Sequence, residues 1–288
     1  MKKQQAIVAG SGIVILIVFY FFGNTVPPLK KSANAISSEK TVQPGVQSLD
    51  IKTILNAGKS KLSPEQQSYV NKLENSVVRG DIKNQQIKAN LQLAQFWKDS
   101  VENGFLPYSY YLGEAAKLEN SEKSLTFAAQ LFLNNLRRQD NPAIKNWMAL
   151  ESRDLFTRAE QLNPDNDSTK IGLGATYIFG STGSEPQEIM KGIQEILAVV
   201  RKDSLNMYAQ LMLGLGGIES GQYDRAIQRL LKVVQFDPGN LEAVLSLSEA
   251  YERTGNTKSA KTWYEAAKKL TDNPELIQAI NERLGSLK

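Results

Sequence analysis

A repeat of fixed length runs through the C-terminal part of this 288-residue chain. Three positions recur at a spacing of 34 residues: Leu213-Gly214 and Leu247-Ser248, Gly221 and Gly255, and Ala226 and Ala260. A period of about 34 residues is typical of helix-turn-helix units that stack on one another. Each unit buries its apolar face only against its neighbours, so the chain is predicted to form a stacked helical array.

Small residues mark the places where the helices of one unit cross or turn. Gly214 and Ala226 are predicted at a close helix crossing, where larger side chains would overpack. Gly221 and Gly255 are predicted at the turns, where glycine adopts a left-handed backbone without steric cost. Residues 237–240, with the sequence Asp-Pro-Gly-Asn, end one unit before the next begins.

This pattern resembles the tetratricopeptide repeat family. The shared features are a Leu-Gly pair, an aromatic residue three positions later, an alanine, a large apolar residue and a closing proline. The resemblance is strong over residues 207–274 and extends upstream through Leu173-Gly174 and residues 162–166. It implies an all-α fold, a helical solenoid in which the first helix of each unit lines a concave groove. It also implies that a protein or peptide binds in that groove.

Two glycines and one long turn depart from the family pattern. Gly217 replaces an aromatic residue, which predicts a gap or a place where something packs from outside. Gly192 replaces an alanine. Residues 180–186 lengthen one turn, a change that is more often a tolerated surface insertion than a functional loop.

The chain is predicted to divide into a cytoplasmic tail (1–5), a transmembrane helix (6–23), a flexible linker (24–62), a repeat array (63–274) and a capping helix (275–288). The linker is rich in Ser, Lys, Gln and Asn, although residues 49–55 within it are expected to form one short helix. Ser63-Pro64 has the pattern of a helix start, and Asn273-Pro274 begins the final helix.

The N-terminal apolar segment predicts a membrane anchor. Residues 6–23 carry no charge, and their length is close to the roughly 20 residues that span a bilayer. A cleaved signal peptide is the alternative, because Ala33 and Ala35 have the small-x-small spacing of a cleavage site. The apolar run is long and bulky for a signal peptide, and those alanines lie well beyond it. An uncleaved anchor is therefore favoured.

Positive charge sets the expected orientation. Lys2 and Lys3 with the N-terminal amine slightly outweigh Lys30 and Lys31, which favours a cytoplasmic N-terminus. The predicted location is the bacterial inner membrane, crossed once, with the repeat array periplasmic or extracytoplasmic.

Composition argues against several kinds of site. The chain has no histidine and no cysteine, so Ser-His and Cys-His catalysis, histidine-ligated metals and zinc ribbons have no residues to build them. Its 34 basic and 30 acidic residues are interspersed, which does not support a nucleic-acid footprint. We therefore expect no enzyme activity, no cofactor, no metal and no small-molecule substrate.

The repeat register places a candidate protein-binding groove on the first helices of the units. The candidate residues are Phe179, Tyr208, Leu211, Met212, Leu215, Glu249 and Glu252. The same register places Gln130, Asn134 and Glu242 on this face. The apolar members predict binding that depends weakly on salt. The alternative is that Met212 and Leu215 are buried between units.

Two functions are consistent with these features. The first is a membrane-anchored scaffold that mediates protein–protein interaction in an envelope complex. The alternative is a holdase-like periplasmic chaperone that binds exported or translocating chains through an apolar surface. Neither the partner nor the pathway is identified by the residues.

Overall fold

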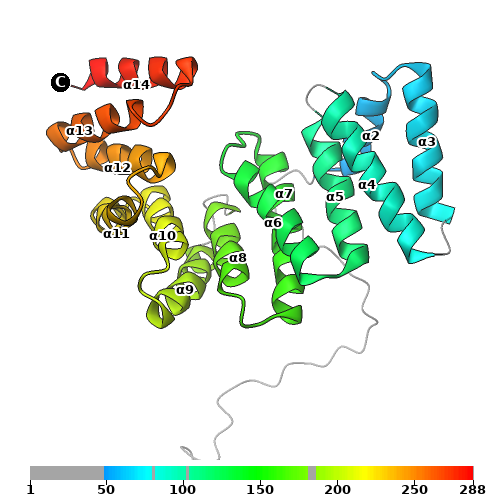
Figure 1. Ribbon diagram of the computed structural model, residues 1–288, viewed down its shortest axis with the longest axis horizontal. Coiled ribbons are helices and arrows are strands. Elements are labelled where there is room, and N and C mark those ends of the chain that lie inside the picture. Colours follow the sequence, from blue (N-terminus) through cyan, green and yellow to red (C-terminus); the bar gives the residue numbers. More distant parts are fainter. Residues whose placement is uncertain (1–48, 80–81, 102–103, 181–185, 288) are drawn as a thin grey trace, which may run out of the picture. The chain divides into compact units, whose positions relative to one another are not determined.

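The computed structural model describes residues 49–287, except 80–81, 102–103 and 181–185. Every regular element in these residues is an α-helix (Figure 1). The predicted all-α architecture is thus confirmed for these residues. The predicted transmembrane helix, residues 6–23, lies outside the described residues, and no helix within them is long and apolar enough to cross a membrane.

The helices are, in chain order, α2 (Ile51–Lys59), α3 (Pro64–Arg79), α4 (Lys83–Ser100), α5 (Phe105–Glu119), α6 (Glu122–Leu136), α7 (Pro142–Leu162), α8 (Asp167–Gly180), α9 (Pro186–Lys202), α10 (Met207–Glu219), α11 (Tyr223–Phe236), α12 (Leu241–Arg253), α13 (Thr257–Lys268) and α14 (Pro274–Ser286).

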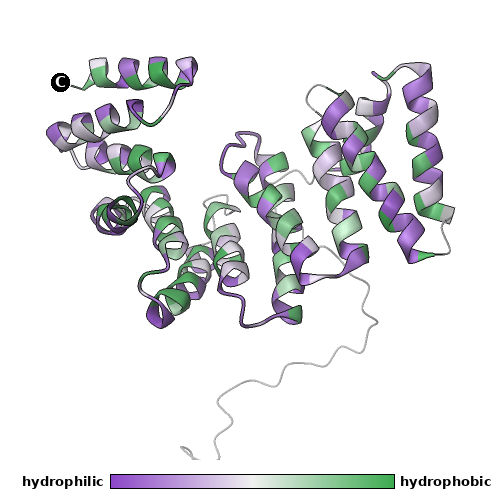
Figure 2. Ribbon diagram, viewed as in Figure 1, coloured by the Kyte–Doolittle hydropathy of each residue, from purple (hydrophilic) through white to green (hydrophobic). Residues whose placement is uncertain are grey.

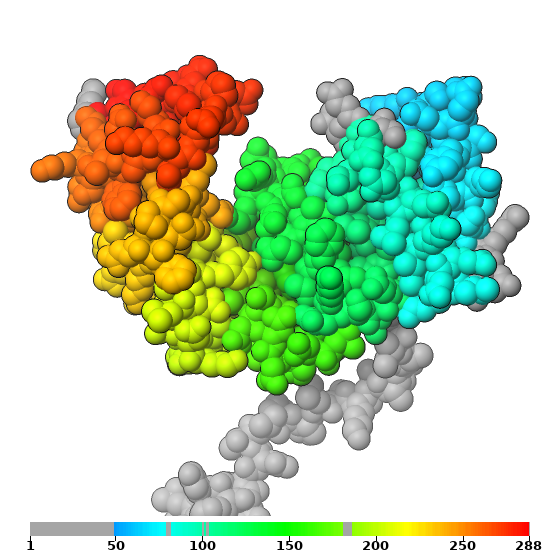
Figure 3. Space-filling view, in the orientation of Figure 1, coloured from blue at the N-terminus to red at the C-terminus, as the bar shows by residue number. Residues whose placement is uncertain are grey.

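Consecutive helices pack as antiparallel pairs, α4 with α5, α6 with α7, α8 with α9, α10 with α11 and α12 with α13. The first helices of successive pairs also contact one another, α6 with α8, α8 with α10 and α10 with α12. Consecutive pairs adjoin in chain order in the space-filling view (Figure 3). The first helices from α6 to α12 therefore form one continuous face, as the repeat register predicts.

The 34-residue period holds where the resemblance is strongest. Helices α10 and α12 begin at Met207 and Leu241, at this spacing. Gly221 and Gly255 have φ angles of 72° and 76°, which confirms the predicted left-handed turns. Asn240 caps α12 by accepting a hydrogen bond from the backbone N–H of Ala243 at 2.9 Å.

Glycines let the paired helices approach closely. A methyl group on Gly214 would lie 2.8 Å from Cγ of Leu230, so the predicted close crossing is present. A methyl carbon on Gly217 would already lie 3.1 Å from Cβ of Ala226. The gap predicted at Gly217 is therefore wrong, because α10 and α11 lie close enough to fill the space that an aromatic ring would need. The long turn at 180–186 includes residues outside the described ones.

The short helix expected over residues 49–55 is present as α2, which spans Ile51–Lys59. Leu55 on this helix is buried, so the segment is part of the folded array and not a flexible linker. Leu55 joins a separate apolar cluster with residues of α3, α4 and α5, including the fully buried Trp97. A second, larger cluster runs from Ala116 on α5 to Ile280 on α14. The prediction of a flexible linker over residues 24–62 is therefore wrong from Ile51 onward. Helix α2 has an apolar side that α3, α4 and α5 cover.

The predicted helix starts are present. At α3 the Oγ of Ser63 accepts from the backbone N–H of Gln66, and the Oε1 of Gln66 accepts from the N–H of Ser63. This reciprocal pair is a capping box. Asn273 caps α14, so the final helix begins where the sequence predicts. Helix α14 contacts α13 and buries Ile280.

Candidate protein-binding surface

Four of the predicted groove residues lie in the core. Phe179, Leu211, Met212 and Leu215 expose only 3%, 7%, 6% and 2% of their surface. Helix α10 is contacted by α8, α9, α11 and α12, so little of its circumference remains open. Most residues of helices α8 and α10 are buried, from Ile171 to Gly180 and from Ala209 to Gly216, and Figure 2 shows these helices largely in green and white. A helix that is apolar around most of its circumference is a core helix. The expected apolar groove at these residues is thereby corrected, and the alternative that Met212 and Leu215 pack between units is favoured.

Tyr208 is the one predicted apolar candidate that keeps a polar group toward the first-helix face. Its hydroxyl donates to Oε1 of Gln130 at 3.2 Å, and Nε2 of Gln130 donates to Oδ1 of Asn134 at 2.8 Å. Burial raises the pKa of Tyr208, although the hydrogen bond to Gln130 opposes this shift. These contacts connect α10 to α6 across the unit that lies between them.

Arg137 extends this connection to two further helices. It follows the last residue of α6, and its guanidinium lies over the ring of Phe179 on α8, 5.0 Å from the ring centroid. The same guanidinium forms an ion pair with Glu242, near the start of α12. Its Nε is buried and finds no hydrogen-bond partner among the described residues. Stacking on an aromatic ring with ion pairing at the edge is a favoured environment for arginine.

We call Gln130, Asn134, Arg137, Tyr208 and Glu242 the first-helix cluster. The register identified four of these residues and missed Arg137. The signal was available, since Arg137 follows Asn134 by three positions and Gln130 by seven, the spacing of one helix face. The exposed groups of the cluster are amides and charged groups. The prediction that binding depends weakly on salt assumed an apolar surface, so its basis is removed.

The two remaining predicted residues make contacts of their own. Glu249 forms an ion pair with Arg253, one turn further along α12. Glu252 accepts from the hydroxyl of Tyr264 at 3.0 Å and from Nε of Arg283 at 2.9 Å. Burial, then the hydrogen bond to Glu252, raises the pKa of Tyr264 to about 12. Glu252 thus connects α12 to α13 and α14, which is a structural task.

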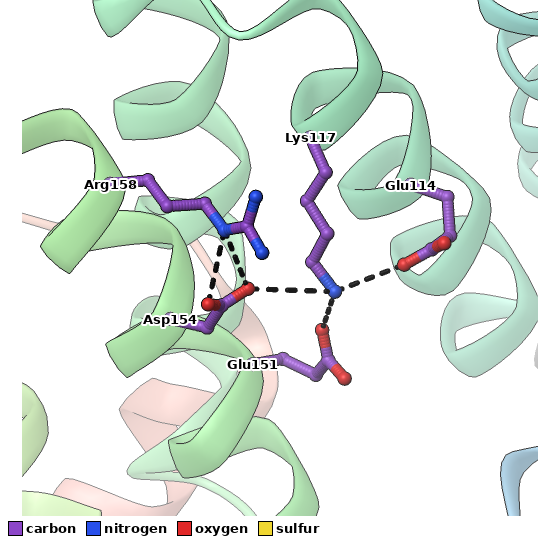
Figure 4. Close-up of polar contacts among 5 residues, drawn as sticks. All are labelled: Glu114, Lys117, Glu151, Asp154 and Arg158. Atoms are coloured by element: carbon purple, nitrogen blue, oxygen red, sulfur yellow. Dashed lines mark hydrogen bonds and ion pairs between the residues drawn. The ribbon is translucent and has the colours of Figure 1, made fainter. Parts of the chain in front are cut away.

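A polar network connects two second helices, α5 and α7 (Figure 4). Nζ of Lys117 lies 3.0 Å from Glu114, 2.7 Å from Glu151 and 3.8 Å from Asp154, and Arg158 pairs with Asp154. Burial lowers the pKa of Lys117, but the attraction of the carboxylates outweighs it and the net shift is upward. Lys117 and Arg158 together offset two of the three negative charges of Glu114, Glu151 and Asp154. Across the described residues, no cluster of three or more acidic side chains has the arrangement of a metal site.

Sequence comparison supports the repeat. The family profile described as tetratricopeptide repeat matches residues 218–283, which confirms the predicted repeats there. No curated protein matches the chain.

Several solved structures have a similar arrangement at low identity. A crystal structure of MamA is 16% identical, with 64% of this chain and 91% of that chain covered and a TM-score of 0.40. MamA from Desulfovibrio magneticus RS-1, residue 41 to its end, is 18% identical, with 65% and 97% covered and a TM-score of 0.43. YrrB, described as a tetratricopeptide repeat protein with an unusual peptide-binding site, is 14% identical, with 74% and 97% covered and a TM-score of 0.41. Likeness at this level carries no inference about what this chain binds.

Proposed function

We propose that this chain, which carries tetratricopeptide repeats over residues 218–283, is a scaffold that binds a protein or peptide partner on its first-helix face. The observation that carries the proposal is the first-helix cluster, where Gln130 of α6 and Arg137, directly after α6, connect to α8, α10 and α12. A binding surface needs polar groups fixed in position, and here side chains from several units hold one another in place.

The chemistry of the cluster suits a peptide backbone or an acidic side chain. Asn134 is exposed, and the amides of Gln130 and Asn134 supply both donors and acceptors. The guanidinium of Arg137 is preorganised over Phe179, so a carboxylate from a partner competes with Glu242 for an arginine that is already positioned. Binding is then expected to weaken as salt concentration rises.

The membrane anchor and the envelope location are the finer part of the proposal. They rest on the uncharged residues 6–23, on Lys2 and Lys3 ahead of them, and on the polar segment that follows. With an uncleaved anchor, the array is held at the outer face of the inner membrane and meets partners there. The scaffold would serve an envelope complex in that setting.

The holdase alternative has less support. A holdase needs an open apolar surface for unfolded segments, and the apolar residues that suggested one, Met212 and Leu215 among them, are core residues. The exposed groups of the first-helix cluster are polar, which favours a partner of defined sequence.

Site-specific crosslinking in cells tests the proposal. A photo-crosslinking phenylalanine analogue in place of Asn134 lies on the first-helix face, and the same analogue in place of the exposed Gln228 on α11 is the matched control. A scaffold gives one or a few discrete adducts from position 134 and none from position 228. A broad smear of adducts would favour the holdase, and equal adducts from both positions would place the partner elsewhere.

A further inference from the structure

A cleft lies among the first four helices of the described chain, α2 to α5. It has a volume of about 480 Å³, within the roughly 300–1,000 Å³ that ligand pockets occupy. Four residues of α2 line it at the spacing of one helix face: Lys52, Leu55, Asn56 and Lys59. The helix rises by about 10 Å from Lys52 to Lys59, so the cleft follows α2 over this length.

Side chains from three helices form an apolar wall in the cleft. Leu55 on α2 is only 7% exposed, and Val77 on α3 and Leu118 on α5 line the same cleft. Val78 also lines it and exposes 82% of its surface. A ligand that covers such a side chain gains from removing it from water. The cleft therefore favours a ligand with an apolar part.

Polar side chains of the wall are bonded within the fold. The hydroxyl of Tyr111 donates to Glu74 at 2.7 Å. Nδ2 of Asn90 donates to the backbone carbonyl of Gln86 at 3.0 Å, and Nε2 of Gln86 donates to the carbonyl of Val77 at 3.1 Å. A polar chain would leave its own donors and acceptors with few partners here, whereas a hydrocarbon chain needs none.

One charged group of the cleft has no ion pair within the described ranges. Lys59 pairs with Glu74 at 2.8 Å, and Glu114 pairs with Lys117 at 3.0 Å. Lys52 lines the cleft from the first turn of α2, is exposed, and forms no such pair. An anionic group is the complement of this charge.

We propose that this cleft binds a single-chain fatty acid, with its carboxylate at Lys52 and its hydrocarbon tail against Leu55 and Val78. The apolar wall selects the tail, and the lysine selects the anionic head. A cleft that follows α2 for about 10 Å suits one medium-length chain and not the two long chains of a phospholipid. This goes beyond the proposed function, because the ligand is a small molecule that is bound and not turned over. It requires no partner on the first-helix face.

Equilibrium dialysis of labelled decanoate against the full-length chain in lipid nanodiscs tests the proposal, with the uptake of empty nanodiscs subtracted. Octanoate is shorter by two CH₂ groups and should bind about tenfold more weakly, because each buried CH₂ adds to the affinity. Decanol has the same tail without the charge and should bind more weakly than decanoate. Higher salt should weaken the binding of decanoate and leave that of decanol unchanged.

Two substitutions test the head and the tail separately. Lys52→Gln should weaken decanoate binding by about fivefold, as expected for loss of an exposed ion pair, and leave decanol binding unchanged. Val78→Asp places a charge beside the tail and should weaken the binding of both ligands by about tenfold. Lys61→Gln, at an exposed lysine in the turn after α2, and Leu205→Asp, at another exposed apolar residue, are the matched controls. Neither residue lines the cleft, so both controls should leave the Kd unchanged.

Circular dichroism of each variant separates lost binding from lost folding, and the comparison of decanoate with decanol in the wild type needs no variant. The proposal is overturned if no fatty acid binds, if decanol binds as tightly as decanoate, or if a folded Lys52→Gln variant keeps the Kd for decanoate. Lys52-dependent binding of anionic phospholipid vesicles without binding of decanoate would assign the cleft to a membrane lipid and also overturn it. Arg137→Ala should leave decanoate binding unchanged, so failure here is distinguishable from failure of the first-helix proposal.

Discussion

Gly192 lies where α8 and α9 cross. Replacing it by alanine tests whether close packing or helix propensity dominates at this position, because the two change the free energy of unfolding in opposite directions. A methyl carbon at this position would lie 2.3 Å from the backbone carbonyl oxygen of Gly174 and 2.8 Å from Cβ of Tyr177. Ordinary contacts begin at about 3.5 Å, so the two helices would have to separate by roughly 1 Å. The obstacle is backbone, which cannot rotate away as a side chain can.

The two contributions to the free energy of unfolding have opposite signs. Overpacking of this kind costs about 1–3 kcal/mol. Alanine in a helix interior is better than glycine by about 1 kcal/mol. The net expectation for Gly192→Ala is a loss of up to about 2 kcal/mol, which corresponds to a Tm lower by a few degrees for a chain of this size.

Thermal unfolding followed by circular dichroism measures the effect, and Gly285→Ala is the control. Gly285 also lies in a helix, α14, but a methyl group there would meet nothing within 4 Å. Gly285→Ala should therefore leave the Tm unchanged or raise it slightly. A Tm raised by Gly192→Ala would refute the close crossing, because helix propensity alone would then account for the change.

Four further outcomes are expected. Ala226→Leu should destabilise the chain by about 1–3 kcal/mol, since Ala226 is fully buried at a helix crossing, and an unchanged melt would show that the register is wrong. Gly221→Ala should lower the Tm because its φ of 72° costs other residues roughly 1–2 kcal/mol, and a raised Tm would contradict the left-handed turn. The pKa of Tyr264 is raised to about 12 in the folded chain, so its neutral form stabilises the fold below about pH 10. This stabilisation is lost as pH rises through about 12. The Tm should therefore fall over this pH range, and it should fall less in Tyr264→Phe. Alkaline phosphatase fused after Lys288 should be active if the array is exported, and an inactive fusion would contradict the topology.

The repeat and its turns could be predicted because their signals are local. Gly221 and Gly255 are required by the backbone conformation of a single turn, and Asn240 caps the helix that follows it directly. The 34-residue spacing needs no knowledge of distant contacts. These features depend on residues that lie within one unit of the sequence.

The binding surface could be predicted only in part, because burial in a stacked array is decided by neighbouring units. Phe179 and Met212 lie on helices whose residues are mainly apolar and mostly buried, and periodicity does not distinguish a core face from a groove face in such helices. The position of Arg137 shows the same limit. Its ring partner and its ion-pair partner come from α8 and α12, far along the chain from α6.

The most direct test of the account is the Kd of the partner captured through position 134, measured with the full-length chain and with Arg137→Ala. Lys232→Ala, at an exposed lysine on α11, is the control for loss of a positive charge. The account predicts binding weaker by about tenfold or more for Arg137→Ala, and unchanged binding for Lys232→Ala, with all three proteins folded. Equal Kd values for the wild type and a folded Arg137→Ala variant would contradict the claim that the first-helix face binds the partner.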